Sequence, residues 1–246
     1  GNNFHAKVSR WFTDAGWHVV VSPYYMDQSQ NKAREIDLVA EKHWSVKDAH
    51  GRDSEAIAVR LFIECKFVAS HSVFWLADKD LMSAKDLVCT RHPFRRDHAD
   101  TGKHHYLSKS PEVAKLFSTQ NSKTAESEPF YKALNQVLSA MVSMSGQSVA
   151  TPSVSRNKQR LVGTLEYPVV VCSSFDQIYS TQFAVASVPM RIEDNFQLDV
   201  RYAYLDRRAS QRNDYFLIDF VAFEKMAEFV DAIDMDARAA ALLASH

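Results

Sequence analysis

The chain has 246 residues, of which 46% are hydrophobic and 24% are charged, and its formal net charge is -1. This length allows a sizeable buried core, and the balance is that of an ordinary globular protein. The near-zero charge does not indicate a nucleic-acid binder, so any surface for nucleic acid must be local. The three scattered cysteines do not suit a disulfide framework. No apolar run approaches the roughly 18 residues of a membrane span, and we expect a cytoplasmic protein without membrane association.

A helix and a strand open the chain. Apolar residues recur at helical spacing from Phe4 onwards and are followed by Gly16, which predicts an amphipathic helix that ends there. Residues 17–25 are rich in β-branched and aromatic side chains and predict a strand. Pro23 weakens the end of that strand, because proline cannot donate a ladder hydrogen bond.

Two further strands, at residues 34–40 and 56–68, interrupt their apolar pattern with charged groups. Asp37 lies in the first of them, and Glu64 and Lys66 lie in the second. Because strand side chains change faces at every residue, Glu64 and Lys66 emerge on the same side. If the two strands are neighbours, Asp37 joins them, and two carboxylates and one ammonium group surround a single point.

The middle of the chain has a looser pattern. A charged stretch at residues 42–55 is expected to connect the second and third strands. The segment 69–128 predicts a short helix within 73–88, a loop crowded with basic residues at 90–110, and a flexible stretch at 118–128.

Regular elements return after this segment. Pro129 opens a convincing helix with an apolar face. A buried strand, an alternating half-buried strand, another strand and a final helix to about residue 243 follow. The helix and the three strands are predicted at residues 130–144, 161–173, 196–204 and 215–223.

The order helix, three strands, insertion, helix and strand, with Asp37 on one strand and Glu64-x-Lys66 on the next, resembles the PD-(D/E)xK nuclease superfamily. The resemblance implies an α/β fold with a restriction-endonuclease-like core, αβββαβ, in which helices flank a mixed central sheet. It predicts a single domain over residues 1–246. The expected parts are a core at about 4–68 and 129–173, an insertion at 69–128 and a C-terminal strand and helix extension at 174–246.

The resemblance also implies a function, namely a metal-dependent endonuclease that hydrolyses phosphodiester bonds in DNA during restriction, defence or repair. Asp37, Glu64 and the backbone carbonyl of Cys65 would bind Mg²⁺, or Mn²⁺ in its place, because these hard cations prefer oxygen ligands. Lys66 would hold the attacking water and offset charge on the phosphate. Double-strand cutting by such a site often implies a homodimer.

Three residues are expected to support this site. Glu35 lies two residues before Asp37 and is therefore expected on the same face of the strand. Gln136 lies on a helix that can face the cleft. Many relatives carry a Glu on the first helix, but no Glu precedes Glu35 here. His5 lies near that place, and a neutral imidazole can bind a metal without supplying negative charge.

One dense basic cluster is a candidate for contacts with the DNA backbone. The alternative is a solvated loop whose charges are offset by Asp97 and Asp100. A smaller basic set lies before the strand at 161–173. The proposed DNA-binding residues are Arg91, Arg95, Arg96 and Lys103 in the cluster, accompanied by His92, His98, His104 and His105, and the smaller set is Arg156, Lys158 and Arg160.

Other interpretations stay open. Glu-x-Lys on a strand is common, and an exposed pair of this kind stabilises a protein by only about 0 to 1 kcal/mol. The spacing of Cys89 and the nearby histidines matches no familiar zinc site. Asp219 lies on a later strand without a lysine partner, and we do not place it in the site. The alternatives to the nuclease are a catalytically weak nucleic-acid-binding module with the same fold and a protein-binding regulator.

Overall fold

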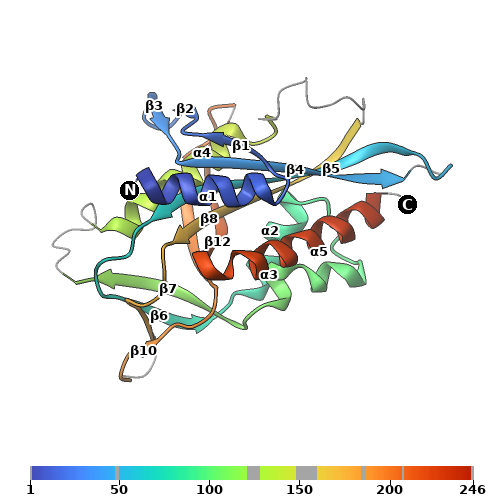
Figure 1. Ribbon diagram of the computed structural model, residues 1–246. Helices are drawn as coiled ribbons and strands as arrows, with labels where there is room; N and C mark the ends of the chain where they lie inside the picture. The colour runs from blue at the N-terminus through green and yellow to red at the C-terminus, as the bar shows by residue number, and fades with distance from the viewer. Residues whose placement is uncertain are drawn as a thin grey trace.

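One large mixed sheet with helices on its faces organises the chain, which is therefore an α/β protein (Figure 1). The computed structural model describes residues 2–47, 50–120, 128–147, 160–183, 187–206 and 208–244. The helices are α1 (Asn2–Asp14), α2 (Leu81–Arg91), α3 (His105–Ser108), α4 (Pro129–Met144) and α5 (Met226–Ala244), with the 3-10 helices η1 (Ala99–Lys103) and η3 (Phe223–Lys225). Within these described helices, none is long and apolar enough to cross a membrane.

The strands form a ten-stranded sheet and a separate two-stranded sheet. They are β1 (His18–Val21), β2 (Tyr24–Asp27), β3 (Lys32–Glu35), β4 (Leu38–Lys47), β5 (Asp53–Lys66), β6 (Ser72–Asp78), β7 (Glu112–Thr119), β8 (Arg160–Cys172), β9 (Ile178–Gln182), β10 (Met190–Arg191), β11 (Phe196–Leu205) and β12 (Gln211–Ala222). The order in the large sheet is β1-β4-β5-β8-β12-β11-β7-β6-β9-β10, while β2 pairs with β3. Helices α1 and α5 lie across one face of the sheet, and α4 lies on the opposite face (Figure 1).

The first strands form an antiparallel meander, in which β1 pairs with β4 and β4 pairs with β5. Strand β8 then pairs with β5 in parallel. A buried ion row, formed by Glu41 of β4, Arg60 of β5 and Glu166 of β8, joins these three strands. Arg60 Nε donates to Glu41 at 2.9 Å and its Nη1 donates to Glu166 at 2.7 Å. Arg60 is 1% exposed, and the two carboxylates accept hydrogen bonds from its buried guanidinium in place of water.

Two predicted strands are each divided in two. The expected strand at 17–25 breaks between β1 and β2, where Ser22 has φ 52° and Pro23 follows it. The expected strand at 34–40 breaks at Ile36 and Asp37, which lie between β3 and β4. The single-strand predictions were wrong here because the β2–β3 hairpin leaves the main sheet and forms its own pair.

The charged stretch at 42–55 was predicted as a connection, and this prediction was wrong. Strand β4 continues to Lys47, and β5 already starts at Asp53. The two strands form a long hairpin arm, in which Val46 is buried while its polar neighbours Ser45 and Lys47 are exposed. The composition of this stretch did not predict a strand pair, because many of its side chains are polar and lie on the exposed face.

The segment 69–128 carries more regular structure than the sequence predicted. Strands β6 and β7 pair with each other and lie within the large sheet, and α2 follows β6. The expected basic loop at 90–110 contains η1 and α3, and its His104 and His105 are buried. Glu128 accepts a hydrogen bond from the Thr119 backbone N–H at 3.1 Å and so ties α4 to β7, while residues 121–127 of the predicted flexible stretch lie outside the described residues.

The predicted elements of the C-terminal half are confirmed at α4, β8, β11, β12 and α5. Their arrangement differs from an added extension, because β12 pairs in parallel with β8 and takes a central place in the sheet. Strand β11 then joins β12 to β7. The Phe130 ring of α4 packs edge-on against Phe74 of β6 and at a tilt against Phe220 of β12, so one helix covers strands from distant parts of the sequence.

Gly163 of β8 is predicted to be sensitive to any added side chain. A Cβ at Gly163 would lie 2.8 Å from Cγ of Pro93 and 2.9 Å from Cδ1 of Ile57. Gly163→Ala is therefore expected to lower the free energy of unfolding by about 1–3 kcal/mol, because overpacking forces neighbours to shift. Chemical denaturation measures the effect, with Gly102→Ala as the control, since nothing lies within 4 Å of a Cβ there. Equal stability of the two variants would contradict this packing.

Candidate functional site

Asp37, Glu64 and Lys66 meet at one end of the β4–β5 pair. In the antiparallel register Leu38 lies opposite Ile63, so Asp37, one residue before β4, lies beside Glu64. The Asp37 backbone N–H donates to Glu64 Oε1 at 3.3 Å, and Lys66 Nζ donates to Glu64 Oε2 at 3.0 Å. Strand alternation and the pairing of neighbouring strands thus place the Glu64 carboxylate in contact with the Asp37 backbone and with the Lys66 side chain.

Glu64 is the most buried member of this group. It is 1% exposed, whereas the side chains of Asp37 and Lys66 are 18% and 20% exposed. Burial raises the pKa of Glu64 to about 7, the ammonium of Lys66 opposes the rise, and the charge of Asp37 adds to it. A cation at this point would offset the cost of ionising Glu64, and the carboxylate oxygens of Asp37 and Glu64 suit a hard divalent ion.

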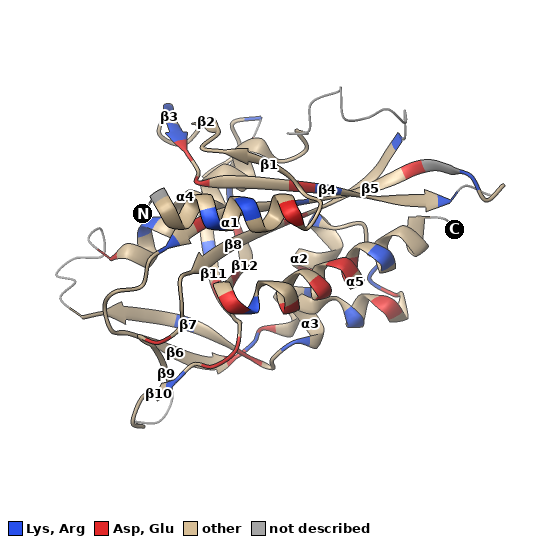
Figure 2. Ribbon diagram, viewed as in Figure 1, with Lys and Arg blue, Asp and Glu red and all other residues tan. Residues whose placement is uncertain are grey.

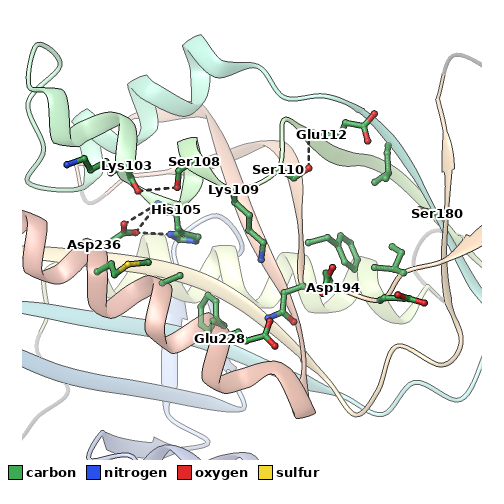
Figure 3. A pocket seen from close by; sticks show the side chains of 18 residues that line it. Lys103, His105, Ser108, Lys109, Ser110, Glu112, Ser180, Asp194, Glu228 and Asp236 are labelled. Carbon is green, nitrogen blue, oxygen red and sulfur yellow. Dashed lines mark hydrogen bonds and ion pairs between the residues drawn. The ribbon is translucent and has the colours of Figure 1, made fainter.

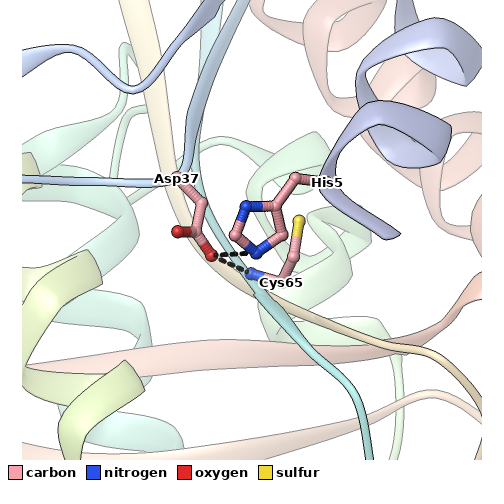
Figure 4. A group of neighbouring side chains, drawn as sticks. All are labelled: His5, Asp37 and Cys65. Atoms are coloured by element: carbon pink, nitrogen blue, oxygen red, sulfur yellow. Dashed lines mark hydrogen bonds and ion pairs between the residues drawn. The ribbon is translucent and has the colours of Figure 1, made fainter. Parts of the chain in front are cut away.

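His5 of α1 completes the group from the other side of Asp37 (Figure 4). Asp37 Oδ2 lies 3.3 Å from His5 Nε2 and accepts a hydrogen bond from the Cys65 backbone N–H at 2.8 Å. One ligand atom from each of these three residues, including Cys65 Sγ, lies within 4.8 Å of the others. Burial raises the pKa of the Cys65 thiol, so the thiol stays protonated and is a poor metal ligand. The oxygen of Asp37 and the imidazole of His5 remain as donors.

Glu35 and Gln136 lie near this group in different roles. Gln136 Nε2 donates to the backbone oxygen of Glu35 at 3.3 Å, and Tyr25 Oη donates to the backbone oxygen of Gln136 at 3.4 Å. Gln136 therefore anchors the chain just before Asp37. Hydrogen bonds from Ser22 and then Tyr24 lower the pKa of the Glu35 carboxyl, which stays ionised at the surface.

A hollow of about 720 Å³ opens beside Asp37 and gives access to it. Helix α1 forms one wall, and the chain around β1 and β3 forms the other. The lining residues are His5, Ala6, Ser9, Arg10, Thr13, Asp14, Val21, Ser22, Glu35 and Asp37. Hydroxyl groups, one guanidinium and the carboxylates of Asp14 and Glu35 thus line the approach to Asp37.

The structure does not bring the predicted DNA-binding cluster to this site. Pro93 contacts the position of Gly163, which pairs with Ile57 on β5. Glu64 lies seven residues further along β5, which corresponds to about 23 Å at roughly 3.3 Å per residue. The basic cluster therefore lies toward the opposite end of the strands.

Most of the cluster is also paired with acidic groups, and blue and red bands alternate over these elements in Figure 2. Arg91 contacts Asp214 at 3.1 Å, and Lys103 contacts Asp100 at 2.7 Å. Arg96 pairs with Asp86, while Arg95 is exposed. Arg160 pairs with Glu55 at 2.5 Å near the start of β8, and Arg156 and Lys158 lie outside the described residues.

A second polar cluster, which the sequence did not reveal, is buried between α3, β12 and α5. His105 lies between two carboxylates, with Nδ1 at 2.8 Å from Asp236 and Nε2 at 3.0 Å from Asp219. Burial lowers the pKa of His105, but the two carboxylates more than reverse this and raise it to about 9. His105 is therefore a buried cation. Asp219 pairs with His105 and is not part of the Asp37 site.

Hydrogen bonds occupy the ring nitrogens of this cluster. The Tyr106 N–H donates to His104 Nδ1 at 3.1 Å, so a neutral His104 carries its proton on Nε2. His104 Nε2 lies 2.8 Å from His92 Nδ1 and 3.4 Å from Asp236 Oδ2. His92 Nε2 in turn lies 3.1 Å from the backbone oxygen of Glu166. The group is a hydrogen-bond network in this structure, and one ligand atom each from His104, His105 and Asp236 lies within 4.8 Å of the others. A cavity of about 670 Å³ adjoins it and exposes the edges of His105 and Asp236 (Figure 3).

Comparisons with known proteins give no relative. The sequence matches no family model and no curated protein, and the structure matches no solved structure.

Proposed function

We propose that this chain is a divalent-metal-dependent nuclease with a restriction-endonuclease-like core, which hydrolyses phosphodiester bonds in DNA. The observation that carries the proposal is that the buried Glu64 accepts hydrogen bonds from the Asp37 backbone N–H and from the Lys66 ammonium group. The order α1, β1, β4, β5, α4, β8 supports it, because it follows the αβββαβ order of that superfamily. A role in restriction, defence or repair belongs to the same proposal.

Asp37 and Glu64 would hold the cation, with His5 as a further donor. When bound, such an ion polarises a phosphate oxygen and lowers the pKa of a water molecule. The Cys65 N–H fixes one oxygen of Asp37 and so aims the other oxygen away from the strand (Figure 4). Lys66, held by Glu64, presents an ammonium group that orients the attacking water and offsets charge on the phosphate.

Metal binding is expected to weaken in acid. Because the pKa of Glu64 is raised to about 7 without metal, a proton competes with the cation below that pH. Affinity for Mn²⁺, measured by titration calorimetry, should fall by about tenfold per pH unit below 7 and level off above it. Glu64→Gln removes the titrating group, so it should bind weakly with a flatter profile. A wild-type profile that stays flat between pH 5.5 and 8 would contradict this role.

The nuclease activity itself is tested with end-labelled DNA in single-stranded, flapped and duplex form. The purified chain should cut at least one of these with Mg²⁺ or Mn²⁺ present, and EDTA should stop the reaction. Catalysis needs the ion, so restoring Mg²⁺ should restore cleavage. Absence of cleavage with either ion, on all three substrates, would exclude the nuclease.

A second candidate is a nucleic-acid-binding module with little or no activity. The observation in its favour is that the α1 side chain in contact with Asp37 among the described residues is His5, whereas many members of that superfamily carry a Glu on this helix, which would add a negative charge. Salt-dependent DNA binding without cleavage would favour this module over the enzyme. Absence of DNA binding would favour a protein-binding regulator.

A further inference from the structure

Two strongly exposed aromatic residues lie next to the Asp37, Glu64 and Lys66 group, one by chain position and one by strand pairing. Phe67 directly follows Lys66 and is 70% exposed. The backbone around it is held in place, because Ser173 N–H donates to the Lys66 oxygen at 2.9 Å and Val68 N–H donates to Ser173 Oγ at 3.1 Å. Phe67 is thus presented to solvent from a fixed strand end.

The second aromatic, Tyr24, lies on β2, whose partner strand β3 leads into Asp37. It is 72% exposed and pairs with Glu35, two residues before Asp37, in the β2–β3 hairpin. The hairpin buries Tyr25 and leaves Tyr24 and Met26 on its solvent face. Tyr24 therefore lies across the hairpin from the segment that leads into Asp37, and Phe67 directly follows the strand that carries Glu64 and Lys66.

Much of the positive charge of the chain, by contrast, is offset by acidic neighbours. A protein that grips duplex DNA through its backbone typically neutralises about 6–10 phosphates with Lys and Arg. Among the described residues, many cations are paired with acidic neighbours, and the whole chain has a net charge of -1. These pairs are Arg34–Asp27, Arg60–Glu41, Arg91–Asp214, Arg96–Asp86, Lys103–Asp100, Lys115–Asp199, Arg160–Glu55, Arg191–Asp176 and Lys225–Asp194.

This combination suits one class of DNA better than the other. In a duplex the faces of the bases are hidden in the stack, so an aromatic side chain cannot lie on them without opening it. In a single strand the faces are available, and stacking on Phe or Tyr supplies affinity that needs little charge.

We propose that the site acts on DNA whose bases are unpaired at the point of cleavage, and that Phe67 and Tyr24 stack on the bases that flank the reacting phosphate. This inference rests on the proposed function. It assigns single-stranded or flapped DNA as the substrate class and places both aromatics in its binding. Arg10, which lines the hollow beside Asp37, is positioned on α1 to meet a neighbouring phosphate.

The test is binding of a fluorescently labelled 12-mer, as a single strand and as a blunt duplex, by anisotropy with Ca²⁺ in place of Mg²⁺. The wild type should bind the single strand at least tenfold more tightly. Phe67→Ala and Tyr24→Ala should each weaken single-strand binding by about tenfold and leave duplex binding unchanged, while Phe67→Trp should keep it. Phe183→Ala is the matched control, because Phe183 is 55% exposed beyond β9, near the other edge of the sheet.

These outcomes distinguish a failure of this inference from a failure of the proposed nuclease function. Equal binding of both DNA forms, with Phe67→Ala like the wild type, overturns the inference and leaves the nuclease standing. Failure to bind or cut either form overturns both. If Phe67→Ala changes only self-association in size-exclusion chromatography, the patch contacts a second copy of the chain, and the inference is overturned.

Discussion

Glu64→Gln and Lys66→Ala are each expected to reduce the rate of DNA cleavage by about 10²–10³-fold. Lys66 supplies the only ammonium that contacts Glu64 within the described site, and loss of one preorganised charge near a reacting centre has effects of this size. Glu64→Gln removes one of the two carboxylates that would hold the cation. Cleavage rates at saturating DNA and Mg²⁺ measure both effects.

The stability of these variants distinguishes a functional role from a structural one. Burial opposes the ionised form of Glu64, so Glu64→Gln should unfold at a temperature no lower than the wild type at pH 8. Lys103→Ala is the matched control for Lys66→Ala, because Lys103 is exposed and contacts only Asp100 among the described salt-bridge partners. Cleavage by Lys66→Ala equal to that by Lys103→Ala would remove Lys66 from the mechanism.

Asp236→Ala is expected to cost about 3–5 kcal/mol of folding stability, because it leaves the buried charge of His105 with one carboxylate in place of two. Asp236 also accepts hydrogen bonds from the His105 N–H at 3.1 Å and from Tyr167 Oη at 3.0 Å, so several buried donors lose their partner. Urea denaturation measures the loss. Asp194→Ala is the control, since its pair with Lys225 is exposed and should contribute about 1 kcal/mol or less.

The same network predicts how stability depends on pH. The folded pKa of His105, about 9, lies above its ordinary value of 6.5. Its contribution is therefore complete below pH 6.5 and is lost as the pH rises through 9. The free energy of unfolding should decline between these values in the wild type and decline less in His105→Gln. A wild-type stability that is constant over this range would show that His105 is neutral in the folded protein.

Local patterns in the sequence were enough to predict helices α1, α4 and α5 and strands β5, β8, β11 and β12. Period-two alternation placed Glu64 and Lys66 on one side, and the 3.0 Å contact between them confirms that prediction. Apolar spacing likewise located α1 and α4. These features depend on neighbours within a few residues, and that information is present in any short window of the chain.

The rest depends on pairing between distant segments. Asp236 and His105 are 131 positions apart, and nothing in either neighbourhood indicates that they meet. The basic residues around Arg91 and Arg96 form a dense cluster in the sequence, yet Asp214 and Asp86 pair with them in the fold. The central position of β12 is equally invisible locally, because it follows from its register with β8.

The most direct test of the central claim is a crystal soaked in Mn²⁺ and measured at a wavelength where manganese scatters anomalously. We expect one strong anomalous peak within bonding distance of a carboxylate oxygen from both Asp37 and Glu64, with Lys66 Nζ next to the bound water. A peak elsewhere, or none between these carboxylates at pH 8, would contradict the proposal that this strand end holds a catalytic cation.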